Sequence, residues 1–264
     1  MKKLDKTTFA AMVTGLLTAT MSAYSGAPQA NKEQPMPSQP TEIKHNPAPS
    51  DNITASPKVL NVGDSRTVGM YLSENKVKYS NFVDAEDADG NLWFAKVGQG
   101  YRWFAENLNS IKKRADDCNA VVINLGVNDL SLSANSKTAA DKYIKQLNEL
   151  AAVWTAQGKK VFFSSANPVG PQYKHSALFN QKIDAFNRQM KEGLSPNITF
   201  IDTNSFIKDK LQAKDFDAAG LHYVPTINRS IHNFIATQIA QTLAKANGNY
   251  HMLTALKNQK TEIR

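Results

Sequence analysis

Hydrophobic residues gather in short runs through the middle of the chain, and between these runs lie longer segments in which they recur at helical spacing. The short runs are rich in β-branched and aromatic residues, a pattern typical of strands covered on both faces. They lie at 59–62, 92–97, 120–125, 160–165 and 198–201. The segments with helical spacing lie at 67–75, 101–114, 139–157, 176–194, 205–211 and 225–246. Because strand and helix alternate, the pattern predicts an α/β fold, a three-layer α/β/α sandwich around a parallel sheet of about five strands.

Two polar segments interrupt this alternation. Residues 84–90 are acidic and contain a glycine, so we expect a turn there. Residues 213–222 are polar and follow the last short helix, so we expect a loop that leads into the final helix.

The two ends of the chain differ in composition from its middle. Residues 1–27 begin with lysines, continue with an apolar stretch and finish in small residues, which indicates a signal peptide or an N-terminal anchor. Residues 28–57 are rich in Pro, Gln and Asn and predict a disordered tether. Residues 58–248 then form one domain without internal repeats, and residues 249–264 form a charged C-terminal tail.

Composition narrows the class of protein. The 264 residues are 41% hydrophobic and 20% charged, as in an ordinary globular protein. The net charge is +8, but Lys and Arg are scattered and form no basic stripe of the kind that binds nucleic acid. A basic surface either favours anionic partners such as wall polymers or is simply solvated. Cys118 is the single cysteine and has no Cys or His at metal-ligand spacing, so we expect a buried thiol and neither an intramolecular disulfide nor a metal or cofactor site.

The first candidate for chemistry is the turn Gly63-Asp64-Ser65, which follows the first predicted strand. A serine where a turn opens into a helix lies beside unpaired backbone N–H groups, a favourable place for a nucleophile. The alternative is that Asp64 or Ser65 only caps the helix. Glycine-containing turns at 98–100 and 126–129 follow other predicted strands, and in parallel sheets such turns meet at one edge, where ligands bind.

A serine nucleophile needs a base and donors for an oxyanion. His222 lies in the loop before the last helix and is the histidine best placed to reach this edge. The other histidines lie in terminal segments (His45, His251) or at or within predicted helices (His175, His232), where a surface or packing role is expected. Donors would be the Ser65 N–H, the Gly98 N–H and the Asn128 amide, although Gly98 and Asn128 can each be simple turn residues.

Together these segments resemble the SGNH (GDSL-type) hydrolases, in particular their exported bacterial members. The resemblance rests on Gly63-Asp64-Ser65, the glycine turn at 98–100, Gly126-Val127-Asn128-Asp129 and Gly220-Leu221-His222, in that order. It implies a flavodoxin-like fold and ester hydrolysis without a metal. It also implies that Ser65 is the nucleophile and His222 the base, with an oxyanion hole made by Ser65, Gly98 and Asn128. Gly100 is a rival to Gly98.

One position departs from the family pattern. The family has an aspartate three residues before the histidine, where it orients the imidazole, and this chain has Ala219. Asp217 is two residues further back and would reach His222 if the loop bulges, and Asp215 is the next carboxylate upstream. Otherwise a backbone carbonyl or water orients His222 in a dyad, or the enzyme is impaired, because losing this aspartate costs about 10⁴ in turnover.

These features predict a secreted serine ester hydrolase, extracellular or associated with the cell envelope. The expected substrate is a small acyl ester on a carbohydrate or cell-wall glycan, with no nucleic-acid partner and no stable membrane insertion after signal cleavage. One alternative is a degenerate glycan-binding protein without activity, suggested by Ala219. Others are an acyltransferase, or a lipase or aryl esterase whose apolar cleft is lined by Trp93, Trp103, Phe104 or Tyr223. The oligomeric state is not indicated.

Overall fold

Six strands form one sheet in the part of the chain that the computed structural model describes, residues 57–246. The strands are β1 (Val59–Gly63), β2 (Phe82–Glu86), β3 (Leu92–Lys96), β4 (Ala120–Asn124), β5 (Lys160–Ser164) and β6 (Ile198–Ile201). Their order in the sheet is β2-β3-β1-β4-β5-β6, and all neighbours are parallel except β2, which runs antiparallel to β3. The predicted α/β sandwich is confirmed, with a mixed sheet of six strands in place of about five parallel ones.

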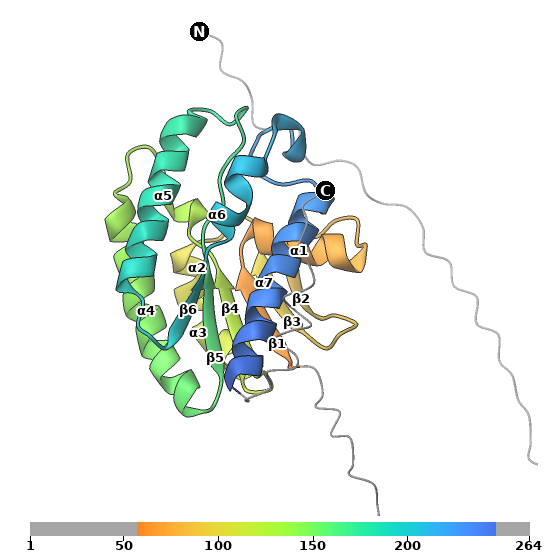
Figure 1. The fold of residues 1–264 in the computed structure, drawn as a ribbon, viewed down its shortest axis with the longest axis vertical. Helices are drawn as coiled ribbons and strands as arrows, with labels where there is room; N and C mark the ends of the chain where they lie inside the picture. The colour runs from red at the N-terminus through yellow and green to blue at the C-terminus, as the bar shows by residue number, and fades with distance from the viewer. Residues whose placement is uncertain (1–56, 247–264) are drawn as a thin grey trace, which may run out of the picture. The chain divides into compact units, whose positions relative to one another are not determined.

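Helices cover both faces of this sheet (Figure 1). They are α1 (Ser65–Asn75), α2 (Tyr101–Glu106), α3 (Leu108–Ala115), α4 (Ser136–Ala156), α5 (Ser176–Gly193), α6 (Thr203–Ile207) and α7 (Pro225–Ala246). Single 3₁₀ turns lie at Val127–Asp129, Lys208–Lys210 and Ala213–Asp215. None of the helices in the described range is both long enough and apolar enough to cross a membrane.

Two hydrophobic cores follow from the alternation of side chains along each strand. Leu60 and Val62 of β1 face a core that contains side chains of α2, α3, α4 and α5. Ala120 and Val122 of β4 face the opposite core, which contains side chains of α1, α6 and α7. All five residues of β4 are buried, as expected for a central parallel strand covered on both sides.

The turn predicted at 84–90 is wrong for its first half. Residues 82–86 form strand β2, and the turn occupies only the few residues between β2 and β3. β2 is an edge strand in which Val83 alone is fully buried, so its exposed acidic positions resemble a turn in the sequence.

The helix predicted at 101–114 is interrupted at Asn107, where α2 ends and α3 begins. Asn107 donates from its side chain to the Trp103 carbonyl at 2.8 Å. Such a local bond gives the backbone an alternative to the helical pattern. The predicted signal peptide at 1–27, the tether at 28–57 except its last residue, and the tail at 249–264 lie outside the described residues.

The carboxyl ends of the central strands lie together and leave room for a site. β1 lies between β3 and β4, and Gly63 is level with Ala95 of β3 and Asn124 of β4. The chain crosses from β1 to β3 on one side and later to β4 on the other. This is a topological switch point, the place where open α/β sheets bind ligands.

Candidate active site

The turn between β1 and α1 positions Ser65. Asp64 is the N-cap of α1, with its carboxylate accepting a backbone N–H of the first turn at 2.9 Å, and Ser65 is the first helical residue. Gly63 has no room for a side chain, since a Cβ there would lie 1.9 Å from Thr67 Oγ1 and 2.6 Å from the Asn124 carbonyl oxygen. Because Asp64 makes the cap, the Ser65 hydroxyl is not used for capping. It lies at the positive end of the helix dipole.

Ser65, His222 and Asp217 form a chain of polar contacts. Ser65 Oγ lies 3.1 Å from His222 Nε2, and His222 Nδ1 lies 3.0 Å from Asp217 Oδ2. The serine is nearly buried, whereas His222 and Asp217 are partly exposed. This geometry allows the imidazole to take the hydroxyl proton while the carboxylate holds the ring.

The loop before α7 shows why Asp217 reaches the histidine although it is five residues away. Phe216 and Tyr223 pair as an antiparallel bridge at the base of the loop, and the Asp217 N–H donates to the His222 carbonyl at 2.8 Å. Asp217 and His222 therefore face each other across the start and end of the loop. Ala219 lies beyond this pairing and is exposed.

Several donors converge on the Asp217 carboxylate. Its Oδ1 accepts the backbone N–H groups of Leu221 at 2.9 Å and His222 at 3.3 Å, and its Oδ2 faces His222 Nδ1. Partial burial acts to raise the pKa of Asp217. The hydrogen bonds from the His222 ring and the two backbone groups outweigh burial and hold this pKa below its ordinary value of 3.8. Asp217 is therefore ionised wherever a histidine titrates.

Arg66 connects the serine turn to the histidine loop, and sequence reasoning missed it. Its buried guanidinium donates to the carbonyls of Asn167, Pro168 at 3.1 Å and Leu221 at 3.4 Å, and it lies 5.3 Å from the centre of the Tyr223 ring. The Leu221 carbonyl immediately precedes His222. Arg66 is thus placed to fix the His222 backbone relative to α1. The one sequence signal is a cation directly after the Gly63-Asp64-Ser65 turn.

The Asn128 side chain lies close to the serine turn, but both of its amide hydrogens are used. Asn128 Nδ2 donates to the Gln99 carbonyl at 2.8 Å and to Asp64 Oδ2 at 3.2 Å. An amide nitrogen carries two hydrogens. To donate to an oxyanion as well, Asn128 must therefore release or share one of these contacts, and the longer one is the contact with Asp64.

The two glycines of the 98–100 turn have different physical roles. Gly98 has φ +73° and open space around its α-carbon, so it is there for its backbone conformation. Gly100 is closely approached, since a Cβ there would lie 2.5 Å from Asp129 Oδ1. Asp129 accepts the Tyr101 N–H at 3.0 Å and the Tyr143 hydroxyl at 2.7 Å. Asp129, which sequence reasoning left without a role, therefore fixes this turn to the segment that carries Asn128.

Asp64 gives a prediction for the dependence of stability on pH. Burial raises the pKa of Asp64 from 3.8 to about 6, partly offset by the Arg66 charge. A raised pKa in the folded state means that stability is fully present below about pH 4 and is lost as pH rises through about 6. We expect this one group to lower the free energy of unfolding by about 3 kcal/mol between about pH 4 and pH 7.

Chemical denaturation of the wild type and Asp64→Asn across this pH range measures the effect. All other titrating groups are shared, so the difference between the two profiles isolates Asp64. Asparagine keeps an oxygen to accept the Arg66 N–H, so the helix cap survives. Parallel profiles would contradict the prediction.

Of the remaining aromatic residues and the cysteine considered from sequence, only Tyr223 lies beside Ser65. Trp93 and Phe104 are completely buried in the two cores and Trp103 nearly so, and among the aromatic residues proposed for an apolar cleft only Tyr223 lines the space beside Ser65. Cys118 is buried, and burial raises the pKa of its thiol to about 11. Within residues 57–246, no three His, Cys, Asp or Glu side chains come together in an arrangement that could hold a metal ion.

A cleft of about 700 Å³ opens beside Ser65 and His222. Helix α1 forms one wall and the start of α7 another, and segment 76–81 between α1 and β2 completes the lining at the far end of α1. Sequence reasoning did not single out segment 76–81. The sequence signal that could have identified it is a run of lysines alternating with a valine and a tyrosine. In the structure this valine and this tyrosine are exposed.

The sequence and the structure were compared with those of known proteins. Residues 62–229 match the GDSL-like Lipase/Acylhydrolase family. A solved GDSL-like lipase from Bacteroides thetaiotaomicron is 20% identical, with a TM-score of 0.53 over 72% of this chain and 88% of that chain. The lipase Lip_vut3 from a goat rumen metagenome is 17% identical, with a TM-score of 0.52 over 68% and 96%. At these identities the two structures show a shared fold only. No curated protein matches the chain.

Proposed function

The chain belongs to the GDSL-like lipase/acylhydrolase family, and from this premise we propose that it is a serine ester hydrolase with Ser65 as nucleophile, His222 as base and Asp217 as the residue that orients His222. The observation that carries the proposal is the continuous contact chain, 3.1 Å from Ser65 Oγ to His222 Nε2 and 3.0 Å from His222 Nδ1 to Asp217 Oδ2. These are the distances that proton transfer requires.

The reaction proceeds in two halves. Ser65 Oγ attacks the ester carbonyl carbon while its proton passes to His222 Nε2, which then gives the proton to the departing alcohol oxygen. The product of this half is an acyl ester on Ser65. Water attacks that ester, His222 takes the proton from water and returns it to Ser65 Oγ, and the carboxylic acid leaves. Asp217 stays ionised throughout and stabilises the imidazolium.

The oxyanion formed in each half needs donors. We assign these to the Ser65 N–H at the start of α1, the Gly98 N–H and the Asn128 amide. Because Asn128 donates to Asp64 and Gln99 in the free protein, the developing oxyanion replaces Asp64 as acceptor. Such a donor bonds more strongly to the charged transition state than to the neutral substrate, which is the condition for lowering the barrier.

The substrate class proposed from the sequence is a small acyl group on a carbohydrate or cell-wall glycan. Support comes from the predicted export signal and tether at 1–57, which would direct the domain to the outside of the cell or to its envelope, and from the net charge of +8. The apolar cleft suggested for a lipase or aryl esterase loses most of its proposed lining, because Trp93, Trp103 and Phe104 are core residues and only Tyr223 lines the cleft. Acyl transfer to a sugar uses the same residues and would appear as partitioning of the acyl group to added alcohols.

A glycan-binding protein without activity is the alternative from another class. It rested on Ala219 alone. The 3.0 Å contact between Asp217 Oδ2 and His222 Nδ1 weighs against this alternative, since it supplies a carboxylate beside the imidazole without one at position 219.

Hydrolysis of p-nitrophenyl acetate by the full chain tests the proposal. We expect saturable release of p-nitrophenol that phenylmethylsulfonyl fluoride abolishes. Intact-mass measurement should then find one sulfonyl group per chain. Masses of the digested peptides should place that group on the peptide that contains Ser65. The reason is that this reagent reacts with a serine whose proton is taken by an adjacent base. Absence of saturable hydrolysis, or labelling at another residue, would contradict the proposed function.

A further inference from the structure

The cleft beside Ser65 extends along α1, away from the nucleophile. Ser65, Gly69, Ser73 and Lys76 all line it, and they recur about once per helical turn. At 1.5 Å per residue, Lys76 lies about 16 Å further along the helix than Ser65. A small acyl group needs only the end near Ser65. The rest of the cleft is available to the part of the substrate that carries the ester.

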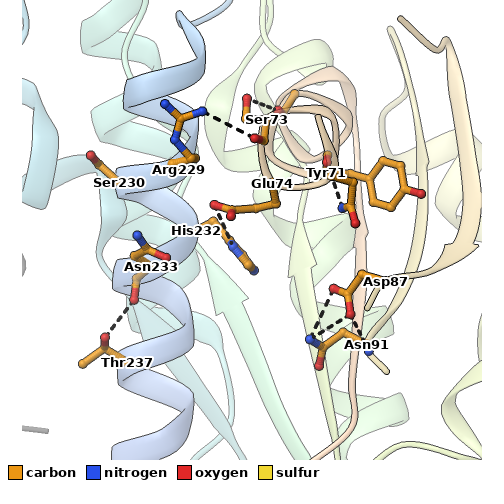
Figure 2. A network of polar contacts seen from close by, with 12 residues as sticks. Tyr71, Ser73, Glu74, Asp87, Asn91, Arg229, Ser230, His232, Asn233 and Thr237 are labelled. Carbon is orange, nitrogen blue, oxygen red and sulfur yellow. Dashed lines mark hydrogen bonds and ion pairs between the residues drawn. The ribbon is translucent and has the colours of Figure 1, made fainter. Parts of the chain in front are cut away.

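The far part of the cleft is positively charged. Lys76, Lys78 and Arg229 line it, and no aspartate or glutamate does. None of the ion pairs found among residues 57–246 involves these three cations. Lys76 and Lys78 are exposed, and Arg229 reaches from α7 to the Ser73 carbonyl at 3.4 Å (Figure 2).

The nearest carboxylate on α1 belongs to a different cavity. Figure 2 shows Glu74 facing His232 between α1 and α7, with Glu74 Oε1 3.4 Å from His232 Nδ1. Glu74 lines a neighbouring cavity together with Asp89, not the cleft beside Ser65. Positive side chains therefore line the cleft beside Ser65, whereas the acidic side chains Glu74 and Asp89 line its neighbour.

Apolar side chains accompany these cations. Tyr79 is 74% exposed, and Val77 and Val97, which are also exposed, line the same cleft. Large apolar groups gathered at one exposed place indicate a binding surface. A tyrosine ring offers a flat face to the ring of a sugar, and the Tyr79 hydroxyl donates to Asn81 Oδ1.

Resting on the proposed function, we propose that the ester is carried by an anionic glycan polymer, and that Lys76 and Lys78 are specificity-determining residues that contact acidic groups on units beyond the acylated one. Cations at a distance of several sugar units from Ser65 fit a chain with repeated negative charge. They also raise the rate of encounter with such a polymer, an effect that salt screens.

Acetate release from two matched polymers tests this inference. One is O-acetylated polygalacturonate, and the other is the same polymer with its carboxylates amidated. We expect the wild type to prefer the charged polymer, and Lys76→Gln/Lys78→Gln to lower kcat/KM for it by about tenfold, as the loss of two exposed charge contacts predicts. The rate on the amidated polymer should not change. In about 1 M salt, where the Debye length is about 3 Å, wild type and variant should converge.

The control variant is Lys112→Gln/Lys113→Gln, which removes the same charge from exposed positions on α3, away from the cleft. Equal losses in both variants, or an equal loss on both polymers, would overturn the inference. So would a wild type that ignores the polymers and cleaves acyl esters in phosphatidylglycerol vesicles. p-Nitrophenyl acetate separates this inference from the proposed function: if the wild type does not hydrolyse it, the proposed function fails, whereas normal hydrolysis without charge preference contradicts the inference alone.

Discussion

Replacing Ser65 by alanine should lower kcat for p-nitrophenyl acetate by at least about 10⁴-fold, because the side chain that forms the acyl intermediate is removed. Ser65 Oγ is the hydroxyl at 3.1 Å from His222 Nε2, and Asp64 makes the helix cap. The substitution therefore removes the nucleophile but leaves the fold intact. Steady-state kinetics together with a thermal unfolding curve separates these two effects.

The matched control is Ser230→Ala on α7. The Ser230 hydroxyl donates to the Thr226 carbonyl within the same helix, so its removal should leave kcat within about twofold, as most surface substitutions do. If Ser65→Ala keeps wild-type turnover and an unchanged unfolding temperature, Ser65 is not the nucleophile, and the esterase activity resides elsewhere on the chain.

The fold can be predicted from the sequence where burial imposes the same residue pattern on successive positions of a strand or helix. The central parallel strands β1, β4 and β5 are buried on both faces, so each appears as an apolar run. β2 escaped prediction because an edge strand buries one side only, and Asp84 and Glu86 face outward. The break at Asn107 depends on a side-chain bond to Trp103, and a pattern of apolar spacing does not register that bond.

The candidate site was predictable to the extent that strand ends converge. Turns after parallel strands meet at one sheet edge, and this alone predicts that Ser65, Gly98, Asn128 and His222 lie close together. The roles of Arg66 and Asp129 depend on which distant carbonyls and N–H groups lie opposite them. Those contacts are tertiary, and the sequence near each residue does not contain them.

Asp217 is the intermediate case. Because Asp217 is five residues from His222, the sequence allows Asp217, a backbone carbonyl or water to orient the imidazole. Which of them does so depends on how the loop closes. The bridge between Phe216 and Tyr223 decides it, by setting Asp217 opposite His222. Alternating polar and apolar residues around a loop do not reveal such a single backbone pairing.

Asp217→Asn is the second substitution for which we expect a large effect. Asp217 Oδ1 already accepts two backbone N–H groups, so the amide oxygen of asparagine should take that place and turn its NH₂ toward His222 Nδ1. The imidazole would then carry its proton on Nε2 and could not accept the proton of Ser65. We expect kcat to fall by about 10³-fold, less than the ~10⁴ of a fully buried aspartate, because the Asp217 side chain is 38% exposed.

A substitution at residue 219, where the family has its aspartate, tests whether Asp217 is the residue that orients His222. Ala219→Asp in the wild type should change kcat by less than about twofold, and it should not rescue Asp217→Asn, because residue 219 is exposed and lies beyond the Asp217–His222 backbone pairing. Asp215→Asn is the matched control, since its carboxylate accepts the Gln212 N–H and an amide oxygen can do the same. Full activity of Asp217→Asn would mean that His222 works as a dyad. Restoration by Ala219→Asp would mean that the loop presents either position, and that the contact between Asp217 and His222 is not required by the chemistry.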